Sequence, residues 1–73
     1  MTLSEAIETP RANVVILPGA GMAEGRKGFV RGISLSYGTV KVGLVDELGN
    51  YTGESIPTNP KFVSLTGGAH THR

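Results

Sequence analysis

Short apolar and β-branched runs, separated by turns rich in glycine and proline, constrain the fold of this chain more than any other feature. Turn residues recur at intervals of about 8–12 residues, which is typical of small antiparallel barrels and sandwiches. The sequence therefore predicts an all-β domain, a small five-stranded antiparallel barrel or sandwich. The predicted strands are residues 13–17, 28–35, 39–45, 51–56 and 61–65.

Alternation within these runs predicts the core, because side chains on one face of a strand recur every second residue. Val30 and Ile33 are three residues apart, and both can point inward only if a bulge at Arg31-Gly32 adds one residue to the strand. Glycine is a residue that bulges use. The predicted core is aliphatic: Val14, Ile16, Val30, Ile33, Val40, Val42, Leu44, Val63 and Leu65.

The first part of the chain is expected to lie outside the barrel domain, which we assign to residues 13–65. Residues 1–12 are predicted to be a flexible N-terminal tail. Leu3, Ala6 and Ile7 have the spacing of one apolar helical stripe, so the alternative is a segment that becomes helical on a partner.

The last part of the chain, residues 66–73, is polar and contains two glycines, and it is predicted to be disordered. His70 and His72 form a His-x-His pair, but two ligands in a tail make a poor metal site. We therefore expect no metal and no cofactor.

Size and composition narrow the class of protein. The chain has 73 residues and no cysteine, so it forms one small domain without disulfides. A domain of this size buries only about 60% of the surface of its unfolded chain. No apolar run approaches the roughly 20 residues of a membrane helix, and the N-terminal residues lack the pattern of a secretory signal. We expect a cytoplasmic monomer with no membrane partner.

The charge balance argues against a protein that depends mainly on phosphate contacts. Seven basic and six acidic residues give a net charge of +1. Proteins that bind nucleic acid through its backbone need a larger basic excess, because each neutralised phosphate requires a lysine or arginine. A protein partner is therefore favoured, with nucleic acid as the weaker alternative.

The part of the chain from the first predicted strand to the third resembles the KOW motif, in which a strand and a loop are followed by Gly-x-x-Gly-x-Val, a short hairpin and an alternating valine strand. The resemblance covers residues 13–46, about half of the chain. It implies a five-stranded SH3-like barrel that docks without catalysis on RNA polymerase, RNA or ribosomal components, as in NusG-type elongation factors and ribosomal proteins. The matching residues are Gly25, Gly28, Val30 and Ile33, followed by Val40, Val42 and Leu44.

Two features depart from that family. The loop at residues 18–25 has no basic residue, whereas nucleic-acid-binding members commonly have a basic loop there. The chain also lacks the second domain with which NusG-type factors hold RNA polymerase. A single domain of this kind resembles the small regulators that bacteriophages direct against host RNA polymerase.

A basic cluster near the start of the second predicted strand is the main candidate for partner binding. Arg26, Lys27 and Arg31 surround Phe29, which lies on the face opposite Val30 and is a candidate exposed anchor. The alternative interpretation is a solvated barrel rim with a buried phenylalanine. The apolar stripe residues Leu3 and Ile7 complete the predicted partner-binding set.

Nothing in the sequence indicates an enzyme, because no nucleophile–base pair, metal shell or cofactor motif is present. The first hypothesis is a transcription regulator that docks on bacterial RNA polymerase as an inhibitor, an antiterminator or both. The alternatives are an RNA-binding or ribosome-associated KOW domain, and a small adaptor subunit of a larger complex.

Overall fold

A computed structural model describes residues 1–69 as one short helix and five strands. Each strand begins or ends near a glycine or proline turn, as turn chemistry requires. The elements are α1 (Leu3–Glu8), β1 (Ala12–Ile16), β2 (Lys27–Ser34), β3 (Thr39–Val45), β4 (Tyr51–Thr58), a single 3-10 turn η1 (Pro60–Phe62) and β5 (Val63–Ala69).

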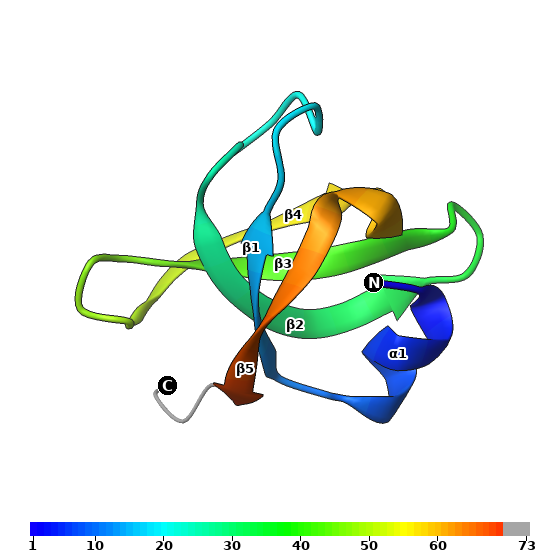
Figure 1. Ribbon diagram of the computed structural model, residues 1–73, viewed down its shortest axis with the longest axis horizontal. Helices are drawn as coiled ribbons and strands as arrows, with labels where there is room; N and C mark the ends of the chain where they lie inside the picture. Colours follow the sequence, from blue (N-terminus) through cyan, green and yellow to red (C-terminus); the bar gives the residue numbers. More distant parts are fainter. Residues whose placement is uncertain (70–73) are drawn as a thin grey trace.

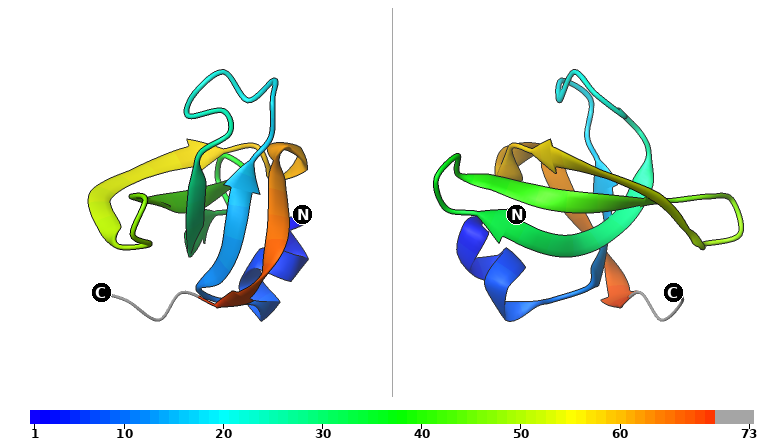
Figure 2. Two further views of the ribbon diagram at one scale, coloured as in Figure 1. Left: turned by 60° about the vertical axis from the view of Figure 1, so that its left-hand side comes forward. Right: turned by 180° about the vertical axis from the view of Figure 1, so that it is seen from behind.

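The five strands form one antiparallel sheet with the order β4-β3-β2-β1-β5. Figures 1 and 2 show that the sheet bends, so that the β1–β5 pair crosses over the β3–β4 pair and encloses the core. The edges of this partly open barrel are β4 and β5. The predicted five-stranded antiparallel barrel is confirmed.

The bulge predicted in β2 is confirmed. Val30 pairs with Val42, and Gly32 pairs with Lys41, so Arg31 is the extra residue in the β2–β3 register. The extra residue lets the inward face continue from Val30 to Ile33, although Ile33 is only partly buried. It also turns the Arg31 side chain onto the outer surface of the sheet, where it is exposed.

The core is aliphatic, as predicted from the alternation. Five side chains are completely buried, and the remaining buried apolar residues pack around them. Leu65 was predicted to belong to this core, but it is 42% exposed. It lies on β5, an edge strand with a neighbour on one side only, so half of its surroundings is open. The completely buried residues are Val14, Ile16, Val40, Val42 and Val63.

The prediction of a flexible tail over residues 1–12 differs from the structure, in which residues 3–8 form α1. A helix of six residues is marginal alone because nucleation is costly, but this one is capped and packed. Thr2 Oγ1 accepts from the Glu5 amide at 3.1 Å, and Glu5 Oε1 accepts from the Thr2 amide at 2.9 Å. Ala6 is buried in the core, so α1 covers one end of the barrel beside β2 (Figure 1).

The predicted strand ends also differ. β4 continues past the predicted end and includes Pro57, which pairs with Lys41. An edge strand tolerates proline, because the side of the strand that has no neighbour needs no backbone N–H for a hydrogen bond within the sheet. β5 extends to Ala69, so the predicted disordered segment 66–73 overlaps it by four residues. His70 and His72 lie outside the described residues.

Candidate functional site: an arginine-lined groove beside β2

Two aromatic rings and two arginines form a cluster on the outer face of the sheet. Phe29 from β2 and Tyr51 from β4 meet edge to face, with ring centroids 5.5 Å apart and planes at 75°. The Arg11 guanidinium carbon lies 5.4 Å from the centroid of Phe29, and that of Arg31 lies 4.7 Å from the centroid of Tyr51. Each ring therefore has a guanidinium over it.

The Arg31 side chain is held in place by its neighbours. Its Nη1 donates a hydrogen bond to Tyr51 Oη, which in turn shares a 2.8 Å hydrogen bond with Ser55 Oγ. Its aliphatic stem lies over Gly43: a Cβ at this glycine would be 2.8 Å from both Cγ and Cδ of Arg31. The absence of a side chain at Gly43 thus makes room for Arg31.

The electrostatics of the cluster are visible at Tyr51, whose pKa is lowered from its ordinary value of 10.0. The hydrogen bond with Ser55 is the main cause, because it stabilises the ionised phenolate. Arg31 lowers the pKa further through its hydrogen bond and its charge, and the charge of Lys41 adds to the effect, while partial burial opposes it. The positive charges of Arg31 and Lys41 thus both lower the pKa of Tyr51.

A groove of about 290 Å³ runs between α1 and β2, and we call it the α1–β2 groove. Ile7 and Pro10 lie on its helix side, and Ile33 lies on its strand side. Arg11 and Arg31 also line it, together with Phe29. The groove therefore combines apolar walls with side chains of the two arginines of the aromatic cluster.

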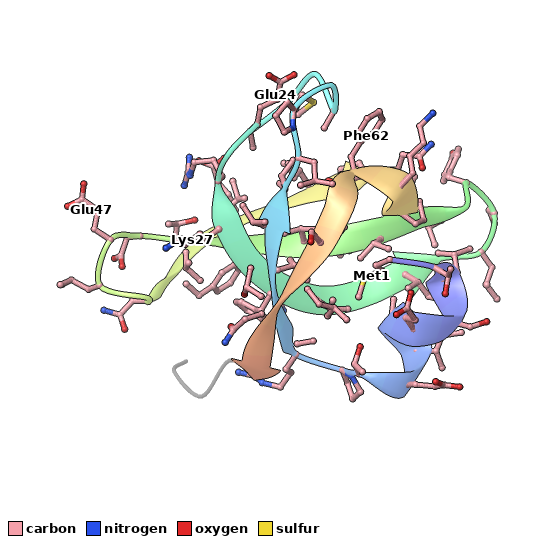
Figure 3. The ribbon with its side chains drawn as sticks, in the orientation of Figure 1. Met1, Glu24, Lys27, Glu47 and Phe62 are labelled. Carbon is pink, nitrogen blue, oxygen red and sulfur yellow. The ribbon has the colours of Figure 1, made fainter. Side chains whose placement is uncertain are left out.

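Among residues 1–69, no acidic side chain lines the α1–β2 groove. Glu24 accepts hydrogen bonds from the Gly19 and Gly21 amides, and Asp46 accepts from the Leu48 and Asn50 amides, so both carboxylates serve their own turns. Figure 3 places Glu24 and Glu47 at loop tips that point away from α1. The charged side chains that line the groove are thus arginines, although the chain as a whole is almost neutral.

The structure brings together three of the six residues predicted to bind a partner: Ile7, Phe29 and Arg31 line the same groove. Ile7 is 60% exposed. Leu3 is half-buried and packs against the core instead.

The remaining two predicted residues, Arg26 and Lys27, are exposed but lie outside the α1–β2 groove. Lys27 pairs with Val15 near the other end of β2, and Figure 3 shows it on the side of the β3–β4 hairpin. The predicted basic cluster is therefore divided between the groove and the far end of β2.

Of the two interpretations of Phe29, an exposed anchor and a buried ring, the structure bears out the buried ring, because the side chain is only 3% exposed. It does lie on the face opposite the main core, as the alternation required. The ring of Tyr51 and the guanidinium group of Arg11 cover it there. Phe29 is therefore the support of the site and not its exposed anchor.

Sequence reasoning missed the other members of the site: Arg11, Gly43, Tyr51 and Ser55. Gly43 is a glycine within an alternating valine strand, and such a glycine signals a close approach by another group. No comparable signal pointed to Arg11 or Ser55, since their roles depend on neighbours distant in sequence.

The described part of the chain contains no cluster of side chains that could form a metal centre. Within residues 1–69, no three histidine, aspartate or glutamate side chains gather as metal ligands. The same residues contain no helix long and apolar enough to cross a membrane. The side chains that line the α1–β2 groove offer apolar contact and hydrogen bonding to an anion.

Comparison of the chain with models of protein families, with curated proteins and with solved structures gives no match.

Proposed function

We propose that this protein is a non-catalytic transcription regulator that acts in the cytoplasm by docking on bacterial RNA polymerase, as an inhibitor of initiation, an antiterminator or both. The observation that carries the proposal is the α1–β2 groove, whose lining includes the exposed Ile7 and also Arg31, a side chain that Tyr51 holds by a hydrogen bond. An apolar contact beside an arginine is the usual composition of a protein interface centre. The KOW resemblance supplies RNA polymerase as the partner, and the small single domain suggests a bacteriophage origin.

Two features support a protein partner over RNA. The net charge of +1 leaves little excess for phosphate contacts. The two rings beside the groove are already covered: Phe29 is buried, and a face of Tyr51 carries the Arg31 guanidinium. Base stacking requires an available ring face.

The test is a pull-down of the tagged protein from a nuclease-treated bacterial lysate, with the captured proteins identified by mass spectrometry. RNA polymerase subunits are expected with the wild-type chain. Arg31→Glu should reduce their capture, because it reverses the charge in the groove. Lys61→Glu is the matched control, since Lys61 lies over Phe62 in η1 and does not line the groove. Capture of ribosomal proteins alone, or a signal that nuclease removes, contradicts the proposal.

RNA binding is the second candidate, and one observation favours it. Lys27, Arg31 and Lys41 are exposed on the neighbouring strands β2 and β3, and within residues 1–69 no salt bridge joins them to a carboxylate. Three cations could neutralise three phosphates of a single strand. The logarithm of RNA affinity would then fall with the logarithm of salt concentration with a slope of about −2. A salt-independent affinity would contradict this candidate.

A further inference from the structure

We infer that the α1–β2 groove receives an acidic segment of the partner, in which a large apolar side chain lies next to an aspartate or glutamate. The inference rests on the proposed function, because it assumes a protein partner, and it adds the chemistry of the segment that is bound. Charge complementarity decides the occupant: Arg31 lines the groove, and no side-chain carboxylate of residues 1–69 does.

Arg31 is prepared for a carboxylate before any partner arrives. A guanidinium has five N–H donors in a fixed fork, and the structure uses Nη1 for Tyr51 Oη. The guanidinium plane lies over the Tyr51 ring, and the aliphatic stem lies over Gly43, where no side chain competes for the space. Binding therefore orders little that is not ordered already, which lowers the entropic cost of forming an arginine–carboxylate pair.

The apolar half of the site lies on the helix side. Ile7 is 60% exposed and faces the groove with Pro10, while Ile33 lies on the strand side. The groove volume of about 290 Å³ is at the lower end of ligand pockets, which measure about 300–1,000 Å³. This space suits one or two side chains of a peptide segment better than a complete cofactor.

The segment must be held through side chains and not by strand addition. Strand addition needs an open sheet edge, whereas β2 is an inner strand that pairs with both β1 and β3. The sequence of the segment therefore matters more than its backbone. Replacing the acidic side chain of the segment should weaken its binding to the groove, and replacing the apolar side chain alone should do so as well.

The experiment uses the ¹⁵N-labelled full chain and short synthetic peptides, followed by NMR shift changes. The first peptide carries leucine flanked by aspartate and glutamate. The second replaces the acids with asparagine and glutamine, and the third replaces leucine with alanine. We expect the first peptide to shift the amides of Ile7, Arg31, Gly32 and Ile33. The other two should bind at least about fivefold more weakly, as expected for the loss of one exposed ion pair or one partly buried apolar contact.

Two variants and one control connect the shifts to named side chains. Arg31→Gln should remove the preference for the acidic peptide over its amide counterpart. Ile7→Ser should remove the preference for leucine over alanine, and its fold should persist because Ile7 is mainly exposed. Lys61→Gln should change neither preference. Equal binding of the acidic and amide peptides by the wild-type chain would overturn the inference.

The remaining outcomes separate this inference from the proposed function. If the groove binds the acidic peptide but the pull-down yields no RNA polymerase, the groove chemistry stands and the proposed partner is wrong. If RNA polymerase is captured equally by the wild type, Arg31→Gln and Ile7→Ser, the partner stands and the inference is overturned. If an oligouridylate shifts the groove amides and displaces the acidic peptide, the occupant is RNA and the inference is overturned.

Discussion

Three glycines of the β2–β3 pair differ in the space that surrounds them, and alanine substitution should reveal the difference. A Cβ at Gly28 would lie 2.4 Å from the carbonyl oxygen of Gly43, and one at Gly43 would lie 2.8 Å from the Arg31 stem. A Cβ at Gly32 would have no atom within 4 Å. None of the three has a positive φ, so the substitutions test space and not backbone conformation.

The expected losses of stability follow from what must move. Gly28→Ala pushes two backbones apart and should cost about 3 kcal/mol, the upper part of the usual range for overpacking. The total free energy of unfolding of a domain of this length is about 4–11 kcal/mol. Gly43→Ala displaces Arg31 by about 0.6 Å to reach ordinary contact at 3.4 Å. This displacement weakens one cation–π contact and one hydrogen bond of Arg31. Alanine also restricts the unfolded chain more than glycine does, which offsets part of the lost stability. The net decrease in the free energy of unfolding should be about 1 kcal/mol. Gly32→Ala should gain about 0.5 kcal/mol.

Urea unfolding followed by far-ultraviolet circular dichroism measures all three variants against the wild type. The predicted order of stability is Gly32→Ala, wild type, Gly43→Ala and Gly28→Ala. Equal stability of the Gly32 and Gly43 variants would show that the Arg31 stem does not depend on Gly43. A loss below about 1 kcal/mol for Gly28→Ala would refute the close approach of β2 and β3.

Three further predictions concern single side chains. Thr58→Val should stabilise the fold by about 1 kcal/mol in urea unfolding, because the buried Thr58 Oγ1 has no hydrogen-bond partner among the described residues; a destabilised variant would contradict this. Thr2→Ala should cost about 1 kcal/mol in the same assay through loss of the α1 cap, and an unchanged midpoint would show that the cap contributes nothing. In a Tyr37→Phe background, Ser55→Ala should raise the pKa of Tyr51 toward 10.0, measured from the tyrosinate absorbance. Because the fold lowers this pKa, ionised Tyr51 favours the folded state above about pH 10, and the contribution disappears as the pH falls; an unchanged titration would argue against the Ser55 hydrogen bond.

Part of the candidate site could be predicted from the chain itself. The basic residues around Phe29 and the apolar stripe containing Ile7 were both identified, because charge and periodicity are local properties. That Ile7 and Arg31 share one groove could not be predicted, since it depends on how α1 packs on β2. The sequence left the burial of Phe29 open for the same reason: alternation places it on the outer face but does not reveal the side chains that cover it there.

Local patterns by themselves determined the strands, the turns, most of the buried faces and the bulge at Arg31. Each of these follows from side-chain periodicity and turn chemistry within a few residues. Tertiary structure alone decided that Arg31 of β2 is held by Gly43 of β3 and Tyr51 of β4, and that α1 closes a groove beside it. These contacts join segments far apart in the chain, and their geometry exists only after the sheet has bent and brought the segments together.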